Sequence, residues 1–457
     1  MRFTNYNLFG LFLFVNLIFL SCSKFEQDNI VDIKAGGATT IFAEFSNAYQ
    51  QPAPNMDKAG FDDHRLGDVL FESIFVTAPA PANGGLGPIF VQNSCVSCHP
   101  KNGRTAFPAP GQDLGGLLAR ISMPGQGIHG ENISVPGFGT QLQTKANFGV
   151  IPEAQLTFFH TFIEGLLVDG EKYELRKPNF EIKNPYIPFP PNVEVSVRIG
   201  PPVFGLGLLE SVTEAEMAKL ADPDDRNKDG ISGRINYVYD ERDGQYKVGK
   251  FGWKASQPDL SSQTAHAFLE DMGLSSPYLP KDPSYGQSQQ DNKMDDPELT
   301  EEVIELATFY TRSLGVPAPR RQLEADVDYG KKLFTFIGCA KCHTPAMVTG
   351  PNSNFPFLAN QKIQPFTDLL LHDMGVGLAD NRPDGLASGK EWRTPPLWGI
   401  GLTQVVAGHT NFLHDGRARN IQEAILWHDG EGRRSKEAYA RLSKNDRNKL
   451  IKFINSL

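Results

Sequence analysis

The sequence contains one five-residue pattern twice, and this repeat constrains the chain more than any other feature. Cys95-Val96-Ser97-Cys98-His99 and Cys339-Ala340-Lys341-Cys342-His343 each place two cysteines on one helical turn and a histidine directly after the second. The pattern Cys-x-x-Cys-His is typical of c-type haem attachment. Both thiols can then reach the vinyl groups of one porphyrin, and the histidine is placed to bind the iron as proximal ligand.

Two other interpretations of paired cysteines explain less. A single Cys-x-x-Cys could be a redox-active dithiol, and two pairs could supply the four thiolates of a zinc ribbon. Neither explains a histidine after both pairs, and a zinc ribbon would not place its halves so far apart in the chain. The sequence therefore predicts two covalent haems. They would be held by Cys95, Cys98, Cys339 and Cys342, with His99 and His343 as iron ligands.

Length and charge limit the class of protein. A chain of 457 residues is long enough for two or three domains with their own cores. Its formal net charge of -9 argues against nucleic acid as a partner, because nucleic-acid-binding proteins carry a basic surface. Four of the five cysteines lie in the haem motifs, and the fifth is Cys22.

The N-terminus is typical of an exported protein. Arg2 precedes a short apolar run over residues 8–20, which is too short to span a bilayer, so residues 1–21 are predicted to be a signal peptide. Cys22 follows directly and is the expected lipidation site of a bacterial lipoprotein; the alternative is an incidental cysteine after an ordinary signal peptide. The polar stretch 22–54 would be a tether. We expect a lipid-anchored protein on the periplasmic or cell-surface side of a bacterial membrane.

A weak internal repeat indicates the domain organisation. Gly67 and Gly330 each begin a Gly-x-x-Leu-Phe element that precedes a haem motif. We therefore predict a mainly α fold, with two tandem cytochrome c-like domains and a β-containing insert. The expected boundaries are 55–190 for the N-terminal haem domain, 191–299 for the insert and 300–457 for the C-terminal haem domain. Within the insert, residues 193–199 alternate like a strand, and a hairpin is expected to turn at Asp243-Gly244.

A possible cation site lies just before this hairpin. Asp225, Asn227 and Asp229 occupy positions one, three and five of a calcium-loop pattern, with Gly230 at position six. Asn236 stands at position twelve, where a bidentate glutamate is expected. The sequence predicts calcium here, and the alternative is a solvated acidic turn.

Several longer sequence runs accompany the two haem motifs. They are residues 137–143 (GFGTQLQ), 204–210 (FGLGLLE), 371–375 (LHDMG) and 412–417 (FLHDGR). Together they resemble a family of bacterial di-haem oxidoreductases, described as peroxidases or thiol oxidoreductases, from about Gly67 to the C-terminus. More distantly the chain is similar to di-haem cytochrome c peroxidases and to the di-haem enzymes that mature methylamine dehydrogenase.

This resemblance implies a division of labour between the haems. One haem is of high potential and receives electrons, and the N-terminal haem meets peroxide. Gln143 and Glu153 keep the ten-residue spacing of the glutamine and glutamate in the peroxidatic pocket of these relatives. A carboxyl group there relays a proton and an amide orients the peroxide. The alternative is a surface pair at a helix start, where Pro152 suits the first helical position.

The resemblance also suggests the distal ligand of the second haem. His428 falls where the peroxidase relatives tend to have a methionine, and imidazole in place of thioether would lower the haem potential. Met374 and His372 are competing ligands.

The remaining candidates have plainer interpretations. Trp253 could relay electrons between the haems or be a packed core residue. His129 could reach the first iron in one redox state. Loop or surface positions are expected for the following histidines: His64, His129, His160 and His266.

These observations predict an exported di-haem oxidoreductase that reduces peroxide at the N-terminal haem with electrons from the C-terminal haem. Its partners would be an electron-donor protein or small reductant, and peroxide or an organic substrate. Haem-dependent oxidation of a protein or organic substrate is the alternative activity. A non-catalytic di-haem electron-transfer protein is the alternative from another class.

Overall fold

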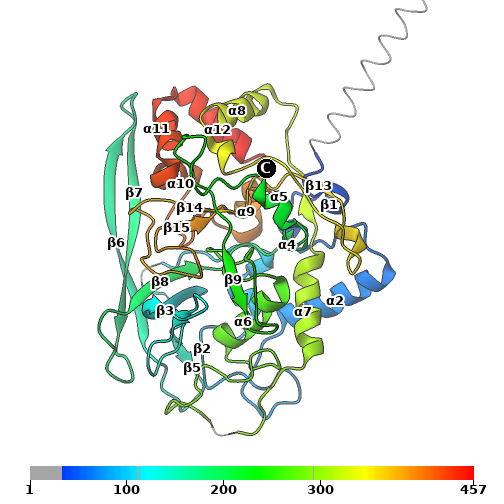
Figure 1. Ribbon diagram of the computed structural model, residues 1–457, viewed down its shortest axis with the longest axis vertical. Helices are drawn as coiled ribbons and strands as arrows, with labels where there is room; N and C mark the ends of the chain where they lie inside the picture. Colours follow the sequence, from blue (N-terminus) through cyan, green and yellow to red (C-terminus); the bar gives the residue numbers. More distant parts are fainter. Residues whose placement is uncertain (1–32, 110, 113, 292) are drawn as a thin grey trace, which may run out of the picture.

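The computed structural model describes residues 33–109, 111–112, 114–291 and 293–457 (Figure 1). The expected signal peptide, Cys22 and the first part of the expected tether lie outside the described residues. Among the described residues, no helix is both long and apolar enough to cross a membrane.

The prediction of a mainly α fold is wrong. The chain is 28% helix and 20% strand, with many small sheets, and is therefore mixed α and β. The helices are α2 (Lys58–Glu72), α3 (Cys95–Cys98), α4 (Leu206–Glu210), α5 (Glu214–Ala218), α6 (Leu260–Met272), α7 (Glu301–Ser313), α8 (Ala325–Phe336), α9 (Thr403–Ala407), α10 (Ile421–Trp427), α11 (Arg433–Arg441) and α12 (Lys444–Ile454).

The strands are short, with three exceptions. The longer ones are β3 (Leu117–Gln126), β6 (Gln155–Leu166) and β7 (Lys172–Lys183). The others are β1 (Thr40–Ile41), β2 (Ile89–Phe90), β4 (Asn132–Ile133), β5 (Lys145–Ala146), β8 (Glu194–Ile199), β9 (Tyr237–Asp240), β10 (Gln245–Val248), β11 (Val316–Pro317), β12 (Met347–Val348), β13 (Lys362–Ile363), β14 (Leu371–Asp373) and β15 (Glu391–Arg393).

Most strand content missed by the sequence prediction comes from two pairings. β6 and β7 form a long antiparallel ribbon at one edge of the molecule, inside the region expected to be a helical haem domain (Figure 1). β3 pairs antiparallel with β8, with Leu117 opposite Ile199. The expected strand over 193–199 is confirmed as β8, and the expected hairpin is confirmed as β9 and β10.

The repeated Gly-x-x-Leu-Phe element marks two close helix crossings. Gly67 lies where α2 crosses α7, and a Cβ there would stand 2.4 Å from the carbonyl oxygen of Leu306. Gly330 lies where α8 crosses α12, and a Cβ there would stand 2.2 Å from the carbonyl oxygen of Lys449. Only glycine allows such close backbone approach. The helix that precedes each haem motif therefore packs against a neighbouring helix through the same kind of close glycine contact.

The N-terminal haem region is completed by segments from elsewhere in the chain. α7, which follows the expected boundary at residue 299, packs against α2 (Figure 1). β1 pairs in parallel with β11. Tyr49, in the second half of the expected tether, is buried, and its hydroxyl donates to the carbonyl of Gly399 at 2.6 Å. Residues 35–54 are thus part of the folded body.

The largest apolar core surrounds the second haem motif. It joins β3 and β8 to α8, α10 and α12, and it includes Trp253. A second core joins α2, α4 and α7 beneath the first haem motif. The two cores together hold both motifs in fixed positions relative to the segment around Trp253.

Candidate haem sites and active site

The first motif forms a short helix that ends at its histidine. α3 carries both cysteines, and the His99 Nδ1 lies 2.7 Å from the carbonyl oxygen of Pro201. A carbonyl can only accept, so in the neutral ring Nδ1 carries the proton and Nε2 has the lone pair that can bind iron. Burial lowers the pKa of His99, which keeps the imidazole neutral. A neutral imidazole with its second nitrogen held in this way is the usual form of an iron ligand.

The second motif repeats this arrangement. His343 Nδ1 lies 3.0 Å from the carbonyl oxygen of Phe366, which again leaves Nε2 free. Burial, together with nearby His428, lowers the pKa of His343 to about 4. The two motifs therefore present the same donor set, although they lie in different parts of the fold.

The thiols do not have the properties of a redox-active dithiol. Burial raises the pKa of Cys95 to about 12 and that of Cys339 to about 12. Reactive dithiols instead depend on a lowered thiol pKa. Two cysteines and a histidine with a free Nε2 at each motif fit a haem better than a dithiol centre.

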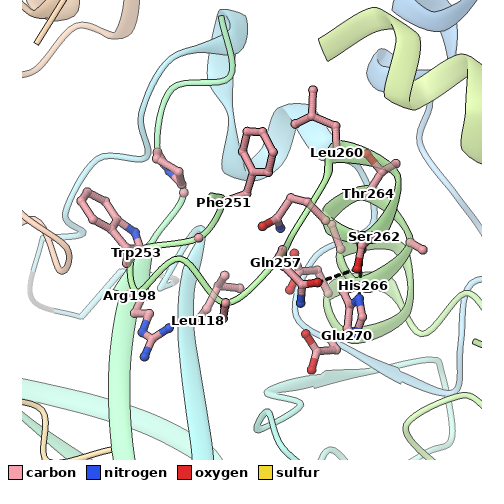
Figure 2. A pocket seen from close by; sticks show the side chains of 18 of the residues that line it. Leu118, Arg198, Phe251, Trp253, Gln257, Leu260, Ser262, Thr264, His266 and Glu270 are labelled. Carbon is pink, nitrogen blue, oxygen red and sulfur yellow. Dashed lines mark hydrogen bonds between the residues drawn. The ribbon is translucent and has the colours of Figure 1, made fainter. Parts of the chain in front are cut away.

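A large cavity borders the first motif. Its volume is about 610 Å³, which is within the range of small-molecule and cofactor sites. Figure 2 shows Trp253 and Arg198 on one side of it, facing His266 and Glu270 from α6. Asp259 caps the N-terminus of α6, and Gly273 ends the helix in the left-handed conformation.

Histidine and carboxylate side chains from α6 line this cavity. His266 Nδ1 lies 2.9 Å from the carbonyl oxygen of Ser262, so its Nε2 is not used within the helix. Glu270 follows one turn later on the same face and forms an ion pair with Arg120 of β3. His266, expected in a loop or on the surface, is therefore a cavity residue on a helix. The sequence signal for this position was the four-residue spacing between His266 and Glu270, which places both side chains on one face of a helix.

Two neighbouring carboxyls in the cavity have opposite pKa shifts. Burial opposes ionisation of Glu270, but Arg120 and the Thr140 hydroxyl, 3.0 Å away, hold its pKa below the usual value. Burial raises the pKa of Asp271 to about 6, although its carboxylate accepts a hydrogen bond from Gln141 Nε2 at 2.8 Å. Such divergence is typical of sites where one acid carries a proton and another stays charged.

The predicted catalytic pair lies elsewhere. Gln143 and Glu153 are together, since the Gln143 main-chain N–H donates to Glu153 Oε2 at 2.7 Å. Both side chains are buried, and Glu153 also accepts from Gln287 Nε2 at 3.0 Å. Neither residue is among those that line the large cavity. Gln143 instead donates to the main-chain carbonyl of Glu270, a residue that does line the cavity, at 2.8 Å.

A smaller cavity of about 180 Å³ borders the second motif. His428 and Met374 both line it, and their side chains lie close to the same point of the chain. His428 Cδ2 and Met374 Cε are each 3.3 Å from the position that a Cβ would take at Gly432. His428 Nδ1 lies 2.7 Å from the Ala424 carbonyl, so its Nε2 is free.

His372 also lines this cavity, but its ring nitrogens already have partners. Nε2 lies 2.9 Å from Asp368 and Nδ1 lies 2.6 Å from Glu431, and these carboxylates, with the Cys342 sulfur, raise the pKa of His372 against the effect of burial. A protonated imidazole cannot bind iron. His372 is therefore the weakest of the three candidate ligands.

The two cavities share one wall. It consists of Arg104, Trp253, Arg393, Pro395 and Pro396, which line both cavities. Trp253 is buried, as expected for a packed core residue, and it lines both cavities; its role as an electron relay stays a prediction.

The predicted calcium loop is held by protein groups. The carboxylate of Asp225 accepts from the Gly230 N–H, and Asn227 accepts from the Asp229 N–H. Asp229 pairs with Lys341 of the second haem motif at 2.9 Å. Asn236, at position twelve, is buried and donates to main-chain carbonyls instead.

The two matched donor sets are those expected of a protein that binds two haems. A family model described as "Di-haem oxidoreductase, putative peroxidase" matches residues 30–457. The chain belongs to this di-haem oxidoreductase family, and the resemblance seen in the sequence is confirmed.

Other comparisons add little. A comparison with curated proteins found no match. Among solved structures, a chain of Kuenenia stuttgartiensis hydrazine synthase, pressurized with xenon, is similar over 34% of this chain, with 21% identity and a TM-score of 0.24. This chain spans 55% of that chain's length.

Proposed function

We propose that this di-haem oxidoreductase reduces peroxide in the large cavity, with electrons that arrive through the haem at Cys339, Cys342 and His343. The asymmetry of the two cavities carries this proposal. The cavity at His99 is the larger and contains acids, further histidines and several arginines, whereas the cavity at His343 is smaller and contains His428 and Met374 as iron-ligand candidates. The first has room and groups for a substrate, and the second suits electron transfer.

The residues of the large cavity suit the proton chemistry of this reaction. Reduction of hydrogen peroxide to two water molecules consumes two electrons and two protons. A haem bound in the cavity supplies the electrons and an iron that can bind oxygen. Asp271, whose pKa burial raises to about 6, donates a proton, and His266 Nε2 holds the peroxide or passes the second proton. The ion pair of Glu270 with Arg120 fixes the charge around the reacting oxygen.

Trp253 is proposed as the route for electrons between the two haems. Its ring lies in the shared wall, so an electron that passes from one cavity to the other meets it there. Covalent c-type attachment at both motifs is part of the proposal. Mass spectrometry of the denatured protein should show two haems retained, and replacement of Cys95 and Cys98 should remove one.

Export and lipid anchoring at Cys22 also belong to the proposal, on the strength of the sequence pattern alone. Radiolabelled fatty acid should be incorporated into the wild-type chain and not into Cys22→Ala. Wild-type protein that carries no lipid would contradict this part.

Calcium at Asp225, Asn227 and Asp229 is proposed from oxygen spacing, and Lys341 competes with it for Asp229. Elemental analysis of undialysed protein decides between them. Bound calcium should also make thermal stability fall on chelation, because a ligand of the folded state stabilises it. Protein free of calcium contradicts this part.

Steady-state consumption of peroxide with an artificial electron donor tests the main proposal. We expect turnover by the purified holoprotein with the donor alone. Peroxide consumed only when an organic compound is added would favour organic oxidation. Two haems that are both low-spin and inert to peroxide would favour an electron carrier.

A further inference from the structure

Two buried arginines in the wall between the cavities have no carboxylate partner. Arg104 and Arg393 are 7% exposed each, and within the described residues neither forms an ion pair. Arg104 donates to the carbonyl of Leu413 at 3.2 Å, and its Nε is buried without any partner. Arg393 donates only to main-chain carbonyls, those of Gly252 at 3.1 Å and Thr394 at 3.3 Å.

The other arginines of the large cavity differ in this respect. Each of them pairs with at least one aspartate or glutamate, so the fold can supply counter-ions in this region. The paired residues are Arg120, Arg198, Arg242 and Arg382. Asp368 attracts Arg393 electrostatically without pairing with it, and the Asp368 carboxylate is bound to His372.

Such isolated cations are costly. A buried charge without a partner opposes folding, so buried charges in proteins are normally paired. Burial lowers the pKa of Arg104 to about 10 and that of Arg393 to about 10, which still leaves both charged at neutral pH. Two charged guanidiniums in an apolar wall therefore indicate that anions bind there in the complete protein.

We propose that Arg104 and Arg393 bind the propionate carboxylates of both haems, so that one pair of guanidiniums anchors the two cofactors across a single wall. This inference rests on the proposed function only in requiring a haem in each cavity. Both side chains line both cavities, and each haem brings two carboxylates. The planar guanidinium, with five donors, matches a carboxylate in a bidentate geometry.

The geometry of Arg104 and Arg393 suits such a role. The guanidinium of Arg104 stands over Trp253 and over Phe412, 5.6 Å from each ring centre. The Arg393 main-chain N–H donates to the carbonyl of Trp253 at 2.9 Å. Trp253 thus contacts both residues, Arg104 through its ring and the Arg393 main chain through its carbonyl, and the arginines would set the charge around it.

The test compares Arg104→Gln and Arg393→Gln with the wild-type holoprotein. The control is Arg447→Gln, because Arg447 is also buried, pairs with Asp169 at 2.7 Å and lines neither cavity. Covalent haem content, the two midpoint potentials and the propionate bands in resonance Raman spectra are measured. Loss of a positive charge beside a haem makes reduction of that haem less favourable. Each glutamine variant should therefore lower both midpoint potentials and shift the propionate bands. The control should leave both unchanged.

Several results would overturn the inference. With two haems bound, unchanged propionate bands would exclude contact with the carboxylates, and a shift at one haem alone would exclude a shared anchor. If the glutamine variants lose haem, Arg104→Lys and Arg393→Lys decide: they should keep potentials near the wild type but shift the propionate bands, and unchanged bands contradict the inference. Wild-type protein without two haems would overturn the proposed function as well.

Discussion

The indole N–H of Trp253 donates to the carbonyl oxygen of Ile199 at 2.9 Å, at the end of β8. This bond holds the ring in the wall between the two cavities. β8 is part of the sheet that also carries Arg120 into the large cavity. The same sheet therefore positions the proposed electron route and one of the charged groups of the large cavity.

Replacement of Trp253 should slow electron transfer between the haems. Trp253→Phe keeps an aromatic ring but loses the hydrogen bond to Ile199, at a cost of about 1 kcal/mol of stability. The rate at which electrons on the second haem reach the first should fall, measured by stopped-flow spectroscopy. Trp392→Phe is the matched control, since Trp392 donates to the Leu378 carbonyl at 3.0 Å and lines only the smaller cavity. Equal rates in the two variants would refute the route.

Asp271 should control the reaction with peroxide. Asp271→Asn replaces the carboxyl with an amide of nearly the same shape that does not donate a proton in the reaction. The rate should therefore fall by roughly a hundredfold or more. The wild-type rate should decrease as the pH rises through about 6, where the Asp271 carboxyl loses its proton, and the variant should lack this step. Glu153→Gln is the comparison, because Glu153 lies outside the cavity and should keep most of the rate. A larger loss in Glu153→Gln than in Asp271→Asn would restore the pair predicted from sequence.

Glu153 should make the stability of the protein depend on pH. Burial raises its pKa from 4.5 to about 8, so the folded state binds the proton more tightly than the unfolded state. Its stabilising effect is complete below pH 4.5 and is lost as the pH rises through about 8, with a total on the order of 5 kcal/mol.

Thermal or denaturant unfolding over this pH range tests that effect. Glu153→Gln should unfold with a smaller loss of stability between these pH values, because the amide does not titrate. A wild-type and a variant curve that run parallel would mean that Glu153 is already ionised in the folded protein.

His428 should bind the second iron. Its Nδ1 is held by the Ala424 carbonyl, so Nε2 is free to bind, while both nitrogens of His372 are occupied. His428→Ala should convert one low-spin haem to high-spin in the EPR spectrum and leave the other unchanged. Met374→Leu should have no such effect. The reverse pattern, with the loss in Met374→Leu, would assign the thioether as ligand.

The haem motifs could be predicted from the sequence because attachment chemistry requires a fixed local spacing. Cys95, Cys98 and His99 lie within one turn, so no tertiary information is needed to place them together. Gly67 and Gly330 were also visible as a repeat, although only the structure shows that they permit two helix crossings.

The groups of the large cavity could not be predicted in this way. Arg120 comes from β3 and His266 from α6, and only packing brings them to one cavity. Gln143 and Glu153 kept the spacing of the family and do touch, but spacing does not determine which wall they face. The long ribbon of β6 and β7 escaped prediction because its two strands are stabilised by each other, across a turn, and not by a local periodicity.

Single turnover of the fully reduced protein with hydrogen peroxide tests whether peroxide takes its two electrons from the two haems. One peroxide should oxidise both haems of one molecule, because its reduction to two water molecules takes one electron from each. The haem at His99 should be oxidised first, and that at His343 should follow through Trp253. Two haems that stay reduced in excess peroxide, or that need one peroxide each, would contradict the account.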